Sequence, residues 1–321
     1  MEQEKPTIKD IISAQKHVYR HLRPTPLYNY STLSDLVGTS TWIKHENHQP
    51  VGAFKVRGGL NLAANLTHEE RNNGLFTAST GNHGQSIAYA ARAYGIKSVI
   101  AVPEEANPGK VAAMRGLGAK VLFYGADFDE AREWIKQIAK DRGGKFVGLT
   151  DEPLIHGVGT YALEIINDLP SVDTIIVPVG AGSGVCGTGI VAKTINKNIE
   201  IIAVQSAQAP AMKLSWDSGT MVEAEMKTFA EGLATRVPFE NTQRIMREYV
   251  DDFILVDDED IKLAISILLE HTHNLVEEAA AAPLAAALQI QERLKNKNVV
   301  LVVSGGNISM QNLKDVIAGI E

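Results

Sequence analysis

The chain has 321 residues, of which 45% are hydrophobic, so it is long enough for about two domains or one large α/β unit with a substantial core. Its formal net charge is −7 and it has no cluster of lysine and arginine, which argues against a nucleic-acid surface because phosphate binding needs concentrated positive charge. We therefore expect a small-molecule partner and no nucleic acid.

Cysteine usage and the N-terminal sequence indicate the compartment. The single cysteine, Cys186, cannot form an internal disulfide, which fits a reducing environment. The first residues are charged and lack the apolar core of a signal peptide. The longest uncharged run, Thr174 to Ala192, is broken by Pro178 and several glycines, so it predicts a strand, a loop and a helix start instead of a membrane span. The expected location is the cytoplasm, with no membrane contact.

In chain order, the first expected element is a helix over residues 7–21. It ends at Arg23-Pro-Thr-Pro-Leu27, because proline disfavours the helical conformation in the residue before it. A strand is expected over 41–46. It leads to a turn with the sequence Val51-Gly-Ala-Phe-Lys55, and a helix is expected over 56–66.

From Gly74 onward, short β-rich runs alternate with amphipathic helical runs, a pattern typical of parallel sheets covered by helices on both faces. Strands are expected over 75–79, 98–103, 120–124, 174–179, 199–205, 253–256 and 299–304. Helices are expected over 84–94, 128–141, 155–168, 185–195, 259–271 and 277–297. The fold class is therefore α/β, with two lobes inferred from length and strand count. Ligands in such folds bind where strands end and helices begin.

Lys55 is the candidate nucleophile. It lies between a glycine-containing turn and a helical run, with Phe54 before it. Burial would remove the hydration of its ammonium group and lower its pKa, which produces an amine able to attack a carbonyl carbon and form a Schiff base. A solvated surface lysine is the alternative for any single lysine, so other segments must support this interpretation.

The segment Val177 to Gly187 joins an apolar strand to a helix and contains Gly180, Gly182 and Gly184. Without side chains, its backbone N–H groups can close on an anion at the positive end of the helix, which predicts a phosphate site. A tight turn without a ligand is one alternative. A nicotinamide site is another, because residues 182–187 match the dinucleotide fingerprint G-x-G-x-x-G. However, the next strand ends in Gln205, where a nicotinamide site would place an acid for the ribose.

Two other loops follow strands. The loop around Ser79, Thr80 and Asn82 offers hydroxyls, an amide and backbone donors, a set suited to a carboxylate or a phenolate, with simple helix capping as the alternative. Ser304 follows the last strand and would direct a hydroxyl above the sheet edge. Together with Lys55 and the glycine loop, these residues offer an amine, an anion cradle, a phenol partner and a ring-nitrogen partner. Those are the four groups that pyridoxal 5′-phosphate requires.

At these residues the chain resembles the fold-type II pyridoxal-phosphate enzymes, most closely the threonine/serine dehydratase and serine racemase family. The shared motifs cover nearly the whole chain in order: 24–27, 44–59, 79–85, 179–184, 230–232 and 304–307. The resemblance implies two open-sheet lobes of the tryptophan synthase β type with the cofactor in the cleft between them. Residues 1–62 plus 149–321 would form the large cofactor-binding lobe and 63–148 the small lobe. It also implies a homodimer.

The resemblance assigns roles to individual residues. Lys55 would form the Schiff base with the cofactor, Phe54 would flank the ring and Asn82 would bond the 3-oxygen. The phosphate would be held by Gly180, Ala181, Gly182, Ser183 and Gly184, and Ser304 would face the pyridine nitrogen. Glu277 matches an acid placed near the cofactor, with a solvated helix carboxylate as the alternative. The substrate carboxylate would be bound by Ser79, Thr80, Gly81, Asn82 and His83, and Gly232 would help to set the pocket size.

A serine at the ring nitrogen cannot hold the pyridinium form as a carboxylate would, so the ring is a weaker electron sink, suited to loss of a β-substituent. The expected function is an ammonia lyase that converts serine, threonine or a related 3-hydroxy amino acid to a 2-oxo acid and ammonia. A racemase is the alternative within the family, less favoured because Thr80 stands where racemases have serine. Outside the class, the alternatives are a nicotinamide oxidoreductase and a non-catalytic amino-acid-binding module.

Two departures from the family pattern carry further expectations. The family's metal site uses carboxylates where this chain has Gln205 and Ala211, and without anionic oxygen we expect no divalent metal, while a monovalent ion stays open. The chain also ends soon after the Ser304 motif, so no C-terminal regulatory domain and no feedback control by isoleucine are expected.

Overall fold

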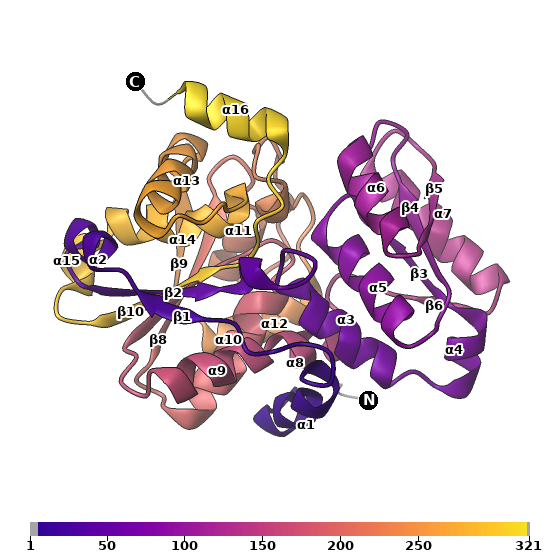
Figure 1. The fold of residues 1–321 in the computed structure, drawn as a ribbon, viewed down its shortest axis with the longest axis horizontal. Helices are drawn as coiled ribbons and strands as arrows, with labels where there is room; N and C mark the ends of the chain where they lie inside the picture. Colours follow the sequence, from indigo (N-terminus) through magenta and orange to yellow (C-terminus); the bar gives the residue numbers. More distant parts are fainter. Residues whose placement is uncertain (1–5, 320–321) are drawn as a thin grey trace. The chain divides into compact units, whose positions relative to one another are not determined.

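The computed structural model describes residues 6–319. Packing divides the chain into two compact units (Figure 1). Unit 1 comprises Met1–Ile8, Pro24–His48 and Tyr161–Glu321, and unit 2 comprises Lys9–Arg23 and Gln49–Thr160. Packing therefore groups residues 9–23, 49–62 and 149–160 with unit 2, whereas the predicted lobe boundaries gave them to the large lobe. That residues 1–62 plus 149–321 form the cofactor-binding lobe, and 63–148 the small lobe, stays a prediction.

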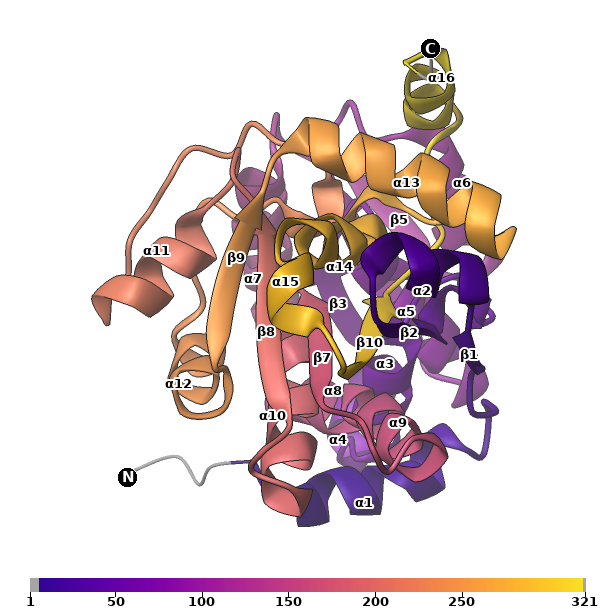
Figure 2. The ribbon, with the colours of Figure 1, turned by 90° about the vertical axis from the view of Figure 1, so that its left-hand side faces the viewer.

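Unit 1 is built on a six-stranded sheet in the order β1-β2-β10-β7-β8-β9 (Figure 2). The strands are β1 (Leu27–Asn29), β2 (Ser40–His45), β7 (Thr174–Pro178), β8 (Glu200–Ser206), β9 (Asp252–Val256) and β10 (Asn298–Val303). All pairs are parallel except β1 with β2, which is antiparallel. The central strands are apolar along their length because helices cover both faces.

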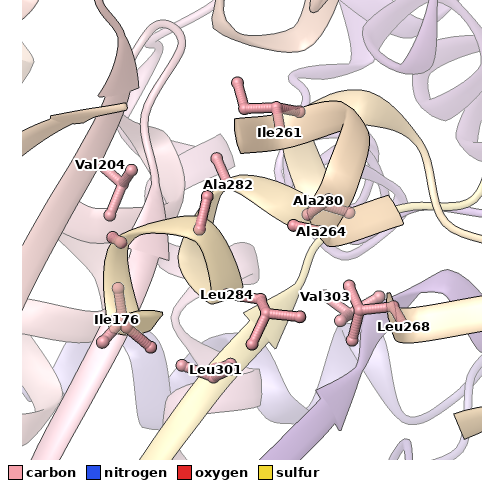
Figure 3. Packing of buried hydrophobic residues seen from close by; sticks show 14 of the residues in the cluster. Ile176, Val204, Ile261, Ala264, Leu268, Ala280, Ala282, Leu284, Leu301 and Val303 are labelled. Atoms are coloured by element: carbon pink, nitrogen blue, oxygen red, sulfur yellow. The ribbon is translucent and has the colours of Figure 1, made fainter. Parts of the chain in front are cut away.

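The helices of unit 1 are α2 (Ser31–Val37), α9 (Thr160–Asp168), α10 (Ser183–Ile195), α11 (Ala211–Ser218), α12 (Glu240–Tyr249), α13 (Asp258–Thr272), α14 (Glu278–Gln289), α15 (Gln291–Leu294) and α16 (Met310–Ala318). Two 3₁₀ helices cover Glu46–His48 and Glu231–Leu233. The alanine-rich α14 is buried against the sheet. Figure 3 shows Ala280, Ala282 and Leu284 of this helix among side chains from β7, β8, β10 and α13. Small side chains let the helix backbone approach the strands closely, which fixes its N-terminus rigidly.

Unit 2 contains a fully parallel sheet in the order β5-β4-β3-β6. Its strands are β3 (Leu75–Ala78), β4 (Ser98–Val102), β5 (Lys120–Phe123) and β6 (Lys145–Phe146). Side chains of β4 alternate between faces: Val99 and Ala101 pack with the residues of α7, and Ile100 and Val102 pack with those of α5 and α6. The helices are α1 (Ile8–Val18), α3 (Lys55–Ala64), α4 (His68–Asn73), α5 (Asn82–Ala93), α6 (Pro108–Gly116), α7 (Phe128–Asp141) and α8 (Glu152–Val158).

Glycines allow α3 to pack closely on α5 and α8. A Cβ at Gly59 would lie 2.5 Å from Ser86 Oγ, and a Cβ at Gly157 would collide with the carbonyl oxygen of Arg57. These contacts leave no room for a methyl group, so the glycines fix the position of the helix that begins at Lys55.

The α/β class and every predicted strand are confirmed, and the structure adds the short strands β1 and β6. Two predicted helices are each divided. Residues 155–168 lie in α8 and α9, which separate at Gly159, where a Cβ would lie 2.7 Å from Ile11 Cδ1. Residues 277–297 lie largely in α14 and α15. Between residues 6 and 319, no helix is long and apolar enough to cross a membrane.

Candidate active site

Lys55 is the first residue of α3 in unit 2. Its Nζ lies 4.9 Å from the centre of the Phe54 ring, and its carbonyl oxygen accepts a hydrogen bond from Ser86 Oγ at 2.6 Å. The backbone at Lys55 is thus anchored to α5. The residue is half-buried, so it is less enclosed than the sequence analysis expected.

The asparagine loop connects β3 to α5, again within unit 2. Ser79 N–H donates to the carbonyl oxygen of Ala101 at 3.1 Å, and Ser79 Oγ accepts from Gly81 N–H at 3.1 Å. Thr80, Gly81 and Asn82 are half-buried, and a Cβ at Gly81 would meet nothing within 4 Å. The loop is therefore fixed at its base and open in front of Gly81, which suits an approaching anion.

His83 is buried beneath this loop. Its Nε2 lies 3.0 Å from Thr77 Oγ1, and that hydroxyl donates to the carbonyl oxygen of Val147 at 2.8 Å. Because the hydroxyl hydrogen is directed to Val147, Nε2 must be the donor and carry the ring hydrogen. Burial, and secondly the nearby charge of Lys55, lower the pKa of His83 to about 3. The imidazole is therefore neutral, and it anchors the loop rather than offering a positive charge.

His83 should make folding sensitive to acid. Its pKa is about 3 in the folded protein, whereas an exposed histidine has a pKa of 6.5, so the unfolded chain gains the proton first as pH falls. This histidine should lower the free energy of unfolding by about 2 kcal/mol between pH 7.5 and pH 5, with no effect above pH 7.5. Urea unfolding at pH 7.5 and at pH 5 measures the loss of stability between these two pH values. In His83→Gln this loss should be about 2 kcal/mol smaller than in the wild type. Equal losses in both proteins would contradict the buried neutral state.

The glycine loop of unit 1 lies between β7 and α10. Gly182 has φ of 97°, in the left-handed region that favours glycine, and a Cβ at Gly180 would collide with the carbonyl oxygen of Gly232. Thr242 Oγ1 donates to the carbonyl oxygen of Ala181 at 2.7 Å. Ser183 and Gly184 begin α10, whose first-turn N–H groups point out of the helix end. Such a loop fits a phosphate group.

Ser304 and Glu277 lie in another part of unit 1. Ser304 follows β10 and is buried. Glu277 is only 6% exposed, so the alternative of a solvated carboxylate does not hold. Its carboxylate accepts from the N–H of Asn307 at 3.2 Å. Glu277 therefore contacts the loop that carries Ser304.

Gln205 is fully buried near the end of β8. Its Nε2 donates to the carbonyl oxygen of Leu233 at 3.4 Å, and its Oε1 accepts from the N–H of Lys213 at 3.3 Å. The side chain links the Glu231–Leu233 turn to α11 through an uncharged amide. Within residues 6–319, no group of three or more histidine, cysteine, aspartate or glutamate side chains could hold a metal ion.

The sequence analysis did not single out the supporting residues Thr77, Ser86, Val147 and Thr242. Thr77 hydrogen-bonds His83, Ser86 hydrogen-bonds Lys55 and Thr242 hydrogen-bonds Ala181, while Val147 accepts from Thr77. These hydrogen bonds span six to 70 residues of chain. A threonine or serine of this kind carries no local signal. The composition of the four predicted groups nevertheless fits pyridoxal phosphate: an accessible amine, open backbone donors, a glycine loop at a helix end and a buried serine.

Comparisons with known proteins agree with that fit. Residues 18–305 match the family model described as pyridoxal-phosphate dependent enzyme. The chain is 38% identical over 313 residues to L-threonine ammonia-lyase of Thermotoga maritima, covering 97% of this chain and 78% of that protein. Among solved structures, the processed form of threonine deaminase isoform 2 from Solanum lycopersicum is similar with a TM-score of 0.93 and 33% identity, over 98% and 92% of the two chains. Serine racemase from Dictyostelium discoideum is similar with a TM-score of 0.89 and 34% identity, over 95% and 99%.

Proposed function

Because this chain belongs to the family of pyridoxal-phosphate dependent enzymes, we propose that it is an ammonia lyase acting on serine, threonine or a related 3-hydroxy amino acid. The β-hydroxyl of the amino acid leaves as water. Hydrolysis of the elimination product then takes up one water and gives a 2-oxo acid and ammonia. The observation that carries the proposal is the 38% identity, across 97% of this chain, to an L-threonine ammonia-lyase.

The cofactor supplies, when bound, an electron sink that makes the Cα–H bond of an amino acid acidic. Lys55 would provide the amine that holds the cofactor's carbonyl carbon, and, once the substrate's amino group had displaced it, the freed Nζ would accept the Cα proton. The Phe54 ring lies beside Nζ and would flank the cofactor ring there. The hydrogen bond from Ser86 Oγ to the carbonyl oxygen of Lys55 fixes the backbone from which this side chain extends.

The remaining loops orient the reacting groups. In unit 2, Ser79 to Asn82 bind the substrate carboxylate through backbone and hydroxyl donors, while neutral His83 holds the loop. In unit 1, Gly180 to Gly184 bind the phosphate, and Ser304 offers a neutral hydroxyl to the ring nitrogen. The N-terminal end of α10 contributes partial positive charge to the phosphate.

Racemisation is the second candidate, favoured by the similarity to a serine racemase. In the family's racemases a serine reprotonates Cα from the opposite face, and Thr80 stands at that position here. Its hydroxyl can serve the same role, although its methyl group restricts the approach. We therefore expect elimination to exceed inversion.

The test is a panel of L- and D-3-hydroxy amino acids given to the cofactor-loaded protein, with oxo-acid release and inversion at Cα recorded together. We expect oxo acid and ammonia from serine or threonine. Inversion without oxo acid would make the protein a racemase. Cofactor binding without either product would make it a binding module.

We also propose a cytoplasmic homodimer. The cytoplasmic location is supported by the single cysteine, Cys186, which is free and buried. Burial raises the pKa of its thiol, so it is not a reactive thiolate. The dimer rests on the family resemblance alone. Light scattering on purified protein and fractionation of cells test the two statements separately.

A further inference from the structure

The loop Ser304-Gly305-Gly306-Asn307 is enclosed by the segment that precedes α14. A Cβ at Gly305 would lie 2.7 Å from Cδ and Oε1 of Glu277, and a Cβ at Gly306 would lie 2.9 Å from the carbonyl oxygen of Leu275. Real Cβ contacts are essentially never this short. The loop and the segment therefore touch along their length, with no space for even one methyl group.

Hydrogen bonds fix this contact. Glu277 N–H donates to the carbonyl oxygen of Gly305 at 3.0 Å, and Asn307 N–H donates to Glu277 Oε2 at 3.2 Å. One residue thus pairs with the loop on both sides of Gly306.

Glu277 is also tied to a rigid element. It is the residue before α14, a helix whose alanines are buried against the sheet. On the other side, Asn47 Nδ2 donates to the carbonyl oxygen of Leu275 at 3.3 Å, which holds the approaching segment. Glu277 therefore transfers the fixed position of α14 to the loop.

We propose that Glu277 is a positioning residue that sets the location of Ser304 by holding Gly305 and Asn307. This inference rests on the proposed function only in that Ser304 is assigned to the cofactor ring. The contact itself lies within unit 1 and should be measurable without cofactor or substrate.

The test is a double-mutant cycle between Glu277→Ala and Gly305→Ala, measured as the melting temperature of the apoprotein and the Kd for pyridoxal phosphate. Gly305→Ala alone should lower the melting temperature and weaken cofactor binding about tenfold, because its methyl group meets the carboxylate. In the Glu277→Ala background, Gly305→Ala should raise the Kd for pyridoxal phosphate by a factor at least about fivefold smaller, because the carboxylate is gone.

Gly306→Ala is the matched control. Its methyl group would meet Leu275 and Asn47 and not Glu277, so its effects should be the same in both backgrounds. Glu277→Gln should stay close to wild type in both measurements, because the amide oxygen still accepts from Asn307. Additive effects of Glu277→Ala and Gly305→Ala, or equal losses in Glu277→Gln and Glu277→Ala, would overturn the proposal. If the apoprotein showed coupling between Glu277→Ala and Gly305→Ala but the loaded protein turned over no amino acid, the positioning role of Glu277 would stand. Only the proposed function would then be rejected.

Discussion

Lys55→Ala protein should release ammonia from serine or threonine at least about 10³-fold more slowly than the wild type. The substitution removes the amine that holds the cofactor's carbonyl carbon and also the group that accepts the Cα proton. Steady-state oxo-acid production is the measurement. Because Lys55 is half-buried and its carbonyl oxygen carries the contact to Ser86, the fold should persist, as circular dichroism can verify.

Lys55→Arg is the control that separates charge from nucleophilicity. Arginine keeps the positive charge, but its guanidinium stays protonated in proteins and cannot act as an amine nucleophile or a base. It should therefore be as inactive as Lys55→Ala. A Lys55→Arg enzyme with more than about a tenth of wild-type turnover would mean that positive charge, and not the amine, is what the reaction needs.

Lys44→Met should lower the free energy of unfolding by about 3–5 kcal/mol, because it leaves a buried carboxylate without its counter-charge. Lys44 Nζ lies 2.6 Å from Glu164 Oε2, with the two side chains 0% and 5% exposed. The same Nζ donates to the carbonyl oxygen of Thr25 at 2.7 Å, and Thr25 N–H donates to Glu164 Oε2 at 3.1 Å. The pair therefore ties β2, α9 and the Pro24–Pro26 segment together. Urea unfolding monitored by fluorescence is the measurement.

Two controls isolate the buried charge. Lys44→Met combined with Glu164→Gln should recover much of the loss, because the amide still accepts from Thr25 and carries no charge. Lys295→Met removes an exposed lysine that lies 2.6 Å from Glu292, and it should change stability by less than about 1 kcal/mol. Losses of similar size in Lys44→Met and Lys295→Met would show that burial does not matter at Lys44.

The features that sequence could predict are local. Apolar runs such as 299–303 mark buried strands, and glycines next to a strand end, as at Gly180 to Gly184, mark a loop that needs an open backbone. Both signals lie within about ten residues of chain. The strands and candidate loops were therefore predictable.

Features that depend on distant partners were not predictable. Gly159, where the predicted helix is divided, packs against Ile11, and the Lys44–Glu164 pair joins residues 120 positions apart. The neutral state of His83 depends on burial and on the nearby charge of Lys55, which lies 28 positions earlier in the chain. Composition shows that such side chains are present, but only the tertiary fold supplies their partners.

The central claim is that Lys55 is the residue that carries pyridoxal phosphate. Reduction of the loaded protein with sodium borohydride, followed by mass spectrometry of its peptides, tests this claim most directly. We predict one pyridoxyl group, on the peptide that contains Lys55, and none in protein treated without cofactor. A label on another lysine, or a loaded protein that gains none, would contradict it.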